Sequence, residues 1–367
     1  MNGRTGTTVG AGGGHGATGA GPRPAAPRDR SDPADPLTAA LARLAPQAGA
    51  VTVAVVRGGR QTVHCHGRSA PDGPAVTPRT VFELGSVTKT FTALLLAELV
   101  AAGAVRYDDP LDAHLPPGRR PTVRRGGPIT LLHLATHTSG LPRLPPGLLA
   151  GAVPHWYTNP YAAFQDDQLV AALARTTVRH PPGSRLRYSN YGVALLGRVL
   201  AGVAGTDYPT LLADRISRPL GLHATTCESA PPHRAVGLRH GRPLPPWRIP
   251  ALPGAGALRS DGEDVLRYLR ALLAPEGLPL ATALADVLRP RLRMPTGDEL
   301  CLVWNLRRLP QGDLLFHTGA TRGFTAFLGL CPQRGTALAA LANCGPALDG
   351  RFVQGAYTAL KALEPDT

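Results

Sequence analysis

The sequence predicts an α/β (α+β) fold, in which one antiparallel sheet is built from N- and C-terminal segments, flanked by helices and interrupted by an all-helical insertion. Two observations lead to this prediction. Apolar runs of strand length occur near both ends of the chain, at 50–66 and at 302–343. Between them, apolar residues recur with helical spacing, and Pro-rich loops separate these stretches. Strands at both ends of the chain therefore indicate one sheet formed by both terminal segments, with a long helical insertion between them.

The first elements follow from local patterns. Residues 36–44 have the amphipathic spacing of a helix. Residues 50–57 predict a strand, the Gly pair at 58–59 predicts a turn, and residues 61–66 complete a hairpin. The helix expected at 86–103 is apolar on nearly every side and ends at a glycine, so we expect it to be central and buried.

The remaining elements are shorter. In the middle of the chain the spacing predicts helices at 166–175, 191–204, 208–216 and 261–273, and a long irregular loop at 234–253. Toward the C-terminus, short apolar runs predict strands at 302–308, 314–317, 324–331 and 336–343. The last two strands are joined by a turn at 332–335, and a helix at 351–363 closes the chain.

These elements divide the chain into three parts: a Gly/Ala/Pro-rich tail at 1–35, an α/β domain formed by 36–142 and 291–367, and a mainly helical insertion domain at 143–290. The tail cannot offset its ordering entropy by burying apolar side chains, so we expect it to be disordered. It also lacks the apolar core of a secretory signal peptide, which predicts a cytoplasmic protein. No stretch approaches the roughly 18 apolar residues of a membrane span, so no membrane partner is expected.

The distribution of charge and the spacing of cysteine and histidine residues indicate which partners and cofactors are not expected. The net charge is +14, but the arginines are scattered and aromatic residues make up only 5% of the chain, so we expect no nucleic-acid binding. The five cysteines form no Cys-x-x-Cys pair, which suits reduced thiols. His64 and His66 share one face of a predicted strand without a third ligand nearby, so we expect no metal and no cofactor. The pattern leaves the oligomeric state open.

The stretch Ser86-Val87-Thr88-Lys89 carries the strongest indication of chemistry. At the start of a helix, a serine and a lysine three residues apart lie on one face, one turn from each other. The chain has only two lysines, Lys89 and Lys361, against 37 arginines. Because arginine stays protonated whereas a buried lysine can lose its proton, Lys89 fits proton transfer from Ser86. The alternative is a helix-capping serine followed by a solvated lysine.

Two other stretches fit this pair. Tyr188 and Asn190 stand in a loop before a helix, where a tyrosine near a lysine can share the proton of a serine and an asparagine can bind a substrate amide. The alternative is an aromatic anchor with an N-cap asparagine. The stretch His317-Thr318-Gly319-Ala320 ends a predicted edge strand whose backbone amide can complete an oxyanion hole with that of Ser86. Its alternative is a polar strand end and turn.

Ser-x-x-Lys, Tyr-x-Asn and His-Thr-Gly in this order resemble the three motifs of the serine β-lactamase and penicillin-binding-protein superfamily. The Tyr-x-Asn form is similar to the branch of class C β-lactamases, esterases and DD-peptidases. The resemblance covers about residues 37–364, and includes the stretches 129–141, 188–197 and 218–222. It implies a β-lactamase/transpeptidase-like fold and a serine hydrolase.

The resemblance also implies roles for individual residues. Ser86 is the expected acylated nucleophile, and Lys89 with Tyr188 the expected general base and acid. The expected substrate-binding residues are Asn190, His317, Thr318, Gly319 and Ala320. The amides of Ser86 and Ala320 are expected to form the oxyanion hole, and a water molecule or another acceptor to release the acyl group.

The chain departs from the antibiotic-cleaving relatives at His317, where their third motif usually has a lysine. A fixed cation is replaced by a group that is neutral or partly charged at pH 7, which favours a small neutral ester or amide over a carboxylate substrate. An acyltransferase or amide-processing enzyme of a secondary pathway uses the same acyl-enzyme and stays open, as do a true β-lactamase and a D-Ala-D-Ala carboxypeptidase. The walls of the site are expected from the loops at 143–180 and 225–260, with Trp156, Tyr157 and Trp247 as candidates.

Overall fold

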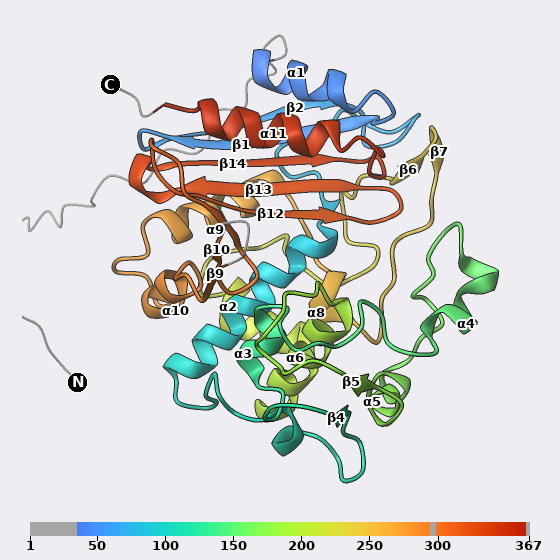
Figure 1. Cartoon of the computed structure of the whole chain (residues 1–367). Coiled ribbons are helices and arrows are strands. Elements are labelled where there is room, and N and C mark those ends of the chain that lie inside the picture. Colours follow the sequence, from blue (N-terminus) through green and yellow to red (C-terminus); the bar gives the residue numbers. More distant parts are fainter. Residues whose placement is uncertain (1–34, 294–298, 365–367) are drawn as a thin grey trace, which may run out of the picture. The chain divides into compact units, whose positions relative to one another are not determined.

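One antiparallel sheet of eight strands organises the structure (Figure 1). The computed structural model describes residues 35–293 and 299–364. The strand order is β2-β1-β14-β13-β12-β11-β10-β9. In that order the strands are Arg60–Gly67, Ala50–Arg57, Thr336–Ala342, Thr325–Cys331, Leu314–Ala320, Asn305–Arg307, Glu299–Leu300 and Leu292–Arg293. Strand β1 pairs with β14 from Val51 with Ala342 to Val56 with Ala337, so the N- and C-terminal segments share the sheet as predicted.

Two helices cover one face of this sheet (Figure 1). Helix α1 (Pro36–Leu44) is capped by Asp35, whose carboxylate accepts the backbone N–H of Thr38. Helix α11 (Arg351–Ala362) buries Phe352, Ala356 and Leu360, which recur every four residues on one side. This apolar stripe is what a helix that packs on a sheet requires.

The other face carries the central helix α2 (Thr88–Ala101), which packs against α6 (Asn190–Val203) and α8 (Pro253–Gly256), while α9 (Gly262–Leu273) lies on the sheet itself. Eleven of the fourteen residues of α2 are buried, which confirms the prediction of a central buried helix. The other helices are α3 (Leu131–Ala135), α4 (Leu148–Ala152), α5 (Asp166–Ala174), α7 (Tyr208–Leu212) and α10 (Ala281–Asp286).

Short elements connect these helices. Single turns of 3-10 helix are η1 (Gly85–Val87), η2 (Leu111–His114), η3 (Val153–His155) and η5 (Pro332–Arg334), and a π turn, η4 (Ala213–Ser217), follows α7. Three pairs of two-residue strands join β3 (Phe82–Glu83) to β8 (Arg259–Ser260), β4 (Thr122–Val123) to β5 (Thr177–Val178), and β6 (Leu238–Arg239) to β7 (Arg242–Pro243). The segment 143–290 is thus mainly helical and also contains four of these short strands.

Two of the predicted strands differ from the structure. The apolar run 302–308 was expected to be one strand, but β11 holds only its last part. Residues 301–304 form a buried turn in which the Cys301 N–H donates to the Trp304 carbonyl (2.9 Å), and Val303 has φ 57°. The second strand, expected at 314–317, continues to Ala320 because residues 317–320 pair with β13. The apolar runs therefore predicted which residues are buried, but not where the strands begin and end.

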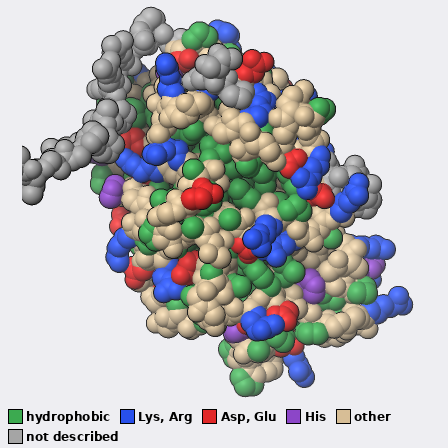
Figure 2. Space-filling model, turned by 90° about the vertical axis from the view of Figure 1, so that its left-hand side faces the viewer, with side chains coloured by type: hydrophobic (Ala, Val, Ile, Leu, Met, Phe, Trp, Pro, Cys, Tyr) green, Lys and Arg blue, Asp and Glu red, His purple; other side chains and the backbone are tan. Residues whose placement is uncertain are grey.

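The tail at 1–34 lies outside the described residues. In the part of the chain that the structure describes, no helix combines the length and the apolarity needed to cross a bilayer. On the face shown in Figure 2, the arginine side chains are interspersed with acidic ones. In the described part of the chain, which contains all five cysteines, no disulfide bond is formed.

Candidate active site

A sharp turn places Ser86 directly before the central helix. Gly85 has φ +51°, a conformation that side chains with a Cβ rarely adopt, and the chain then enters α2 through η1. Lys89 lies one turn further on the same side. Its Nζ donates a hydrogen bond to Ser86 Oγ at 2.9 Å and another to the backbone carbonyl of Ala255 in α8 at 2.6 Å.

Lys89 is fully buried. Burial lowers the pKa of its amine, because the protonated form loses its hydration, and the charge of Arg143 lowers the pKa further. The nearby Tyr188 phenol acts in the opposite direction, without cancelling the effect of burial. The environment therefore makes a neutral lysine amine accessible below the ordinary pKa of 10.5.

Tyr188 approaches the same serine from a different part of the chain. Its hydroxyl donates a hydrogen bond to Ser86 Oγ at 2.8 Å. The backbone around it is fixed at two points: the Ser189 hydroxyl donates to the Pro142 carbonyl at 2.6 Å, and the Asn190 N–H donates to the Arg143 carbonyl at 3.0 Å. The cap of α6 is Ser189, whose Oγ accepts the N–H of Gly192, and not the asparagine that the alternative interpretation assigned to it.

Cations surround the Tyr188 ring. Burial raises the pKa of its phenol, but the charge of Lys89 and the hydrogen bond with Ser86 outweigh burial, and Arg143 adds to them, so that the net pKa lies below 10.0. Lys89 Nζ lies 5.1 Å and the Arg143 guanidinium 5.3 Å from the ring centroid. The His137 ring lies 4.4 Å away and is neutral, because burial lowers its pKa well below 6.5.

His137 holds the loop that carries Tyr188. Its Nδ1 accepts the backbone N–H of Ser189 at 3.3 Å, and its carbonyl accepts the N–H of Arg187 at 2.7 Å. Among the described residues, its buried Nε2 has no hydrogen-bond partner.

The third motif lies against the serine turn. A Cβ on Gly85 would lie 2.5 Å from the Ala320 carbonyl oxygen, and a Cβ on Gly319 would lie 2.0 Å from the Leu84 carbonyl oxygen. Both glycines are therefore required for strand β12 to approach η1 this closely. Strand β12 is internal to the sheet, but β11 pairs only with residues 314–316, so residues 317–320 have an open edge on that side.

The side chain of His317 is buried. Burial is the main cause that lowers the pKa of its imidazole to about 3, and the Lys89 charge adds to it. The imidazole is therefore neutral at pH 7, and its Nδ1 is buried without a partner in the described part of the chain. A neutral donor–acceptor group thus stands where a lysine would place a cation.

These residues line one cavity of about 700 Å³. Ser86, Tyr188 and Asn190 lie on its lining together with residues 317–322. Asn190 keeps its Oδ1 free of hydrogen bonds, while its Nδ2 donates to the Tyr161 hydroxyl at 3.4 Å. The structure thus brings all eight predicted site residues together, with Lys89 buried directly beneath the lining. Within the described ranges 35–293 and 299–364, no Asp or Glu side chain lines this cavity.

Of the three aromatic candidates for the wall, Trp156 and Trp247 line the cavity, whereas Tyr157 does not and is 75% exposed. The sequence pattern did not indicate Arg143, Tyr161, Asn305 or Arg322, which also line it. No local signal marks them, because each reaches the cavity only through the tertiary arrangement. Among the described residues, no cluster of His, Cys, Asp or Glu could hold a metal ion.

A buried ion pair supports the wall. Glu83 Oε1 accepts a hydrogen bond from the guanidinium of Arg259 at 3.2 Å and another from the Trp247 N–H at 2.8 Å. Its Oε2 accepts the hydroxyl of Thr321, the residue after Ala320. Burial raises the pKa of Glu83, while the charge of Arg259 opposes that rise. One carboxylate therefore ties the aromatic wall to the end of β12.

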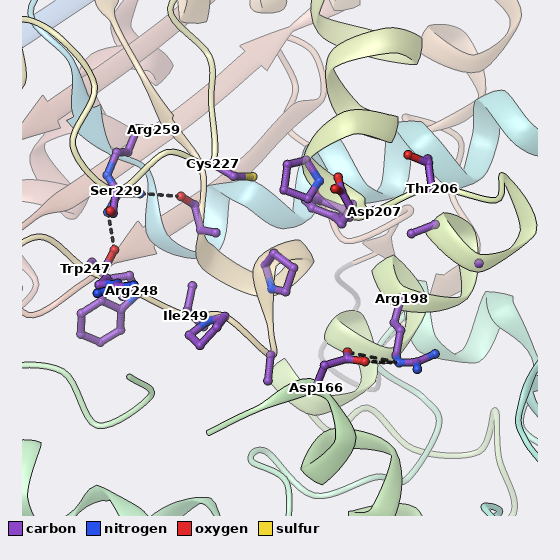
Figure 3. Close-up of a pocket in the computed structure, with 18 residues that line it drawn as sticks. Asp166, Arg198, Thr206, Asp207, Cys227, Ser229, Trp247, Arg248, Ile249 and Arg259 are labelled. Atoms are coloured by element: carbon purple, nitrogen blue, oxygen red, sulfur yellow. Dashed lines mark hydrogen bonds and ion pairs between the residues drawn. The ribbon is translucent and has the colours of Figure 1, made fainter. Parts of the chain in front are cut away.

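A second cavity, of about 630 Å³, borders the same wall (Figure 3). It has Trp247 in common with the catalytic cavity and is also lined by Cys227, Arg259 and the Asp166–Arg198 ion pair. Helix α8 contributes Pro253 to this lining, and its Ala255 carbonyl accepts the hydrogen bond of Lys89. Helix α8 therefore contacts both Lys89 and the second cavity.

A serine that accepts hydrogen bonds from an amine and a phenol and lines a cavity is the arrangement of a serine acyl-hydrolase. The chain belongs to the Beta-lactamase family, whose match spans residues 37–363, and it is a serine hydrolase. Its fold is that of class C β-lactamases and penicillin-binding-protein homologues, as predicted.

The similar proteins are named as D-alanyl-D-alanine carboxypeptidases, as a penicillin-binding protein and as a β-lactamase. Over 302 residues the chain is 29% identical to the D-alanyl-D-alanine-carboxypeptidase/endopeptidase AmpH of Escherichia coli (strain K12), covering 77% of this chain and 76% of that protein. It is 30% identical to penicillin-binding protein 4 of Amycolatopsis lactamdurans, covering 75% of each chain. A solved β-lactamase/D-alanine carboxypeptidase from Pseudomonas syringae has a TM-score of 0.77 at 24% identity, covering 90% of this chain and 99% of that one.

Proposed function

We propose that the protein cleaves a small ester or amide through a covalent acyl-enzyme on Ser86, with Lys89 and Tyr188 as the proton-transfer pair. One observation carries this proposal: Ser86 Oγ accepts hydrogen bonds from Lys89 Nζ at 2.9 Å and from the Tyr188 hydroxyl at 2.8 Å, and it faces a cavity of about 700 Å³. Proton transfer by positioned groups of this kind contributes roughly 10²–10⁴-fold to a rate.

Acylation begins when Ser86 Oγ attacks the carbonyl carbon of the substrate. The serine proton passes to the member of the Lys89–Tyr188 pair that is deprotonated, and the amides of Ser86 and Ala320 stabilise the oxyanion. The pair then gives the proton to the leaving alcohol or amine as the carbon–heteroatom bond breaks. Water repeats the sequence on the acyl-enzyme and releases the carboxylic acid and free Ser86.

The polar side chains Asn190 and His317 favour a substrate that carries no charge beside the bond that is cleaved. The buried Oδ1 of Asn190 has no hydrogen-bond partner among the described residues, and an N–H of the substrate would supply one. The neutral imidazole of His317 supplies no fixed charge for a carboxylate. Both features support an ester or amide without a carboxylate beside the scissile bond.

A D-alanyl-D-alanine carboxypeptidase is the second candidate. AmpH carries that activity in its name. Two guanidinium groups, those of Arg143 and Arg322, line the cavity, and no acidic side chain of the lining opposes them. These cations offer a carboxylate an alternative to the missing lysine of the third motif.

Turnover assays separate the candidates. The purified protein is given 4-nitrophenyl acetate and butyrate, a chromogenic cephalosporin, and a peptide ending in D-Ala-D-Ala, with Ser86→Ala as the control. Ester cleavage that disappears in Ser86→Ala, with little cephalosporin turnover, supports the proposal, and release of D-Ala supports the second candidate. An acyl-enzyme that forms but does not turn over indicates transfer to an acceptor other than water, and no acylation of Ser86 by any substrate overturns the hydrolase mechanism.

A further inference from the structure

The exposed large apolar side chains of this protein are concentrated in one short segment. Leu149, Val153, Trp156 and Tyr157 are 51%, 74%, 44% and 75% exposed, and only three other large apolar side chains of the described residues are comparably exposed. All four belong to the stretch that contains α4 and η3. Scattered exposed apolar residues need no explanation, but a cluster marks a surface that contacts something.

The end of this segment, residues 144–157, is held in place by hydrogen bonds to its backbone. Arg322 donates to the Trp156 carbonyl at 2.8 Å and lies 5.7 Å from the indole. Arg239 does the same for the next residue, donating to the Tyr157 carbonyl at 2.9 Å with its guanidinium 5.8 Å from the phenol ring. Two arginines from the 321–324 turn and from β6 thus fix the end of the segment through its backbone, so its side chains keep their positions after substitution.

One side of the segment faces the catalytic cavity. Leu144, Leu148, Leu149 and Trp156 line the same cavity as Ser86, whereas Val153 and Tyr157 do not. Across the cavity the apolar lining continues with Pro160, Tyr161 and Trp247. The exposed apolar surface is therefore continuous with the site of acylation.

The volume of the cavity and the charges of its lining residues limit which chemical groups it can bind. A volume of about 700 Å³ lies in the range that holds ligands much larger than an acetyl group. Among the described residues, no carboxylate side chain lines it, so the lining offers a cationic group no ion pair. The segment contributes only apolar side chains to the lining, namely those of Leu144, Leu148, Leu149 and Trp156.

We infer that Leu144, Leu148, Leu149 and Trp156 form the binding surface for a large apolar group of the substrate, and that the protein acts on esters or amides that carry a medium-length alkyl or aryl group. This inference rests on the proposed function, because it names the substrate class of the same site. The apolar group gains affinity by leaving water for the side chains of Leu149 and Trp156. Each methylene that becomes buried is expected to raise kcat/KM by up to roughly fourfold, the equivalent of ~0.8 kcal/mol.

Two series of esters test the inference and locate the group. In the first, 4-nitrophenyl acetate, butyrate, hexanoate and octanoate vary the acyl side. In the second, alkyl acetates from ethyl to octyl vary the alcohol side. We expect kcat/KM to rise at least threefold for each two-carbon step in one of the series, and a flat or falling dependence in both series overturns the inference.

Substitutions within the segment supply the matched control. Leu149→Ala and Trp156→Ala remove side chains that line the cavity, and we expect them to lower the octanoate-to-acetate ratio of kcat/KM by about fivefold or more. Val153→Ala and Tyr157→Ala remove exposed side chains of the same segment outside the cavity, and the ratio should remain unchanged. Equal effects of all four substitutions, or none, contradict a substrate surface and favour contact with another protein.

The two proposals fail in different ways. If acetate is cleaved in a Ser86-dependent manner without any preference for longer chains, only the inference is wrong. If no ester is cleaved, the rate at which ethyl and octyl fluorophosphonates label Ser86 replaces turnover as the measurement. Faster labelling by the octyl reagent that is lost in Leu149→Ala supports the apolar surface even then, and equal labelling rates overturn it.

Discussion

Replacing Arg143 with glutamine is expected to shift the acidic limb of the pH–rate profile to higher pH. The Arg143 charge lowers the pKa of both Tyr188 and Lys89. Each group accepts a proton only in its deprotonated form, so activity falls as the pH drops through the pKa of the pair. Loss of the positive charge makes protonation of either group easier. The limb therefore moves upward whichever of the two groups is the acceptor.

The size of this shift follows from the geometry. The Arg143 guanidinium lies 5.3 Å from the centroid of the Tyr188 ring. A unit charge at that distance is worth about 0.8 kcal/mol in bulk water and about 3 kcal/mol at an effective dielectric constant of about 20. Arg143 is an exposed side chain, so the lower part of this range applies. We therefore expect a shift of about one pH unit, with roughly tenfold lower activity on the acidic limb and little change on the plateau.

The assay is kcat/KM for a neutral 4-nitrophenyl ester between pH 5 and 10, with Arg143→Lys as the control that keeps the charge. High salt should reduce the shift, because the interaction is partly exposed to solvent. A limb that stays in place in Arg143→Gln would refute the electrostatic reasoning. An equal loss of activity at every pH would instead assign Arg143 to substrate binding.

Three further substitutions test other parts of the site. Lys89→Met should lower ester turnover by about 10²–10⁴-fold, while the melting temperature holds or rises because a buried amine without an acidic partner is removed; turnover above a tenth of the wild-type rate would exclude proton transfer by Lys89. Gly319→Ala should lower both activity and melting temperature, because the new Cβ would lie 2.0 Å from the Leu84 carbonyl oxygen; Gly202→Ala in helix α6, where a Cβ meets open space, is the control that should leave activity unchanged and the melting temperature unchanged or higher. His317→Lys should increase the rate of acylation by penicillins, since it restores a cation beside the substrate carboxylate, and an unchanged rate would contradict the account of that position.

The local sequence pattern was enough to predict the elements that are determined by residues close together in the sequence. The hairpin at 50–67 and the closing helix have the expected bounds to within one or two residues, because turn glycines and an apolar stripe define them. The Ser86–Lys89 pair was also predictable, since three residues of helix bring the two side chains together. The run at 302–308 was misread because a buried turn and a strand are equally apolar.

The rest of the site depends on tertiary contacts. Tyr188 lies 102 residues from Ser86 in the sequence, and only the order of motifs connected them. Arg143 and the Glu83–Arg259 pair had no local signal, because their significance comes from partners far away in the chain. The apolar surface at 144–156 was equally hidden: its side chains resemble an ordinary short helix until the cavity beside them is known.

The most direct test of the central claim is the mass of the intact protein, quenched in acid within the first turnovers of 4-nitrophenyl butyrate. The account predicts that the protein gains the mass of one butyryl group, that peptide mapping places this group on Ser86, and that Ser86→Ala gains nothing. A butyryl group on another residue, or turnover that persists in Ser86→Ala, would contradict an acyl-enzyme on Ser86.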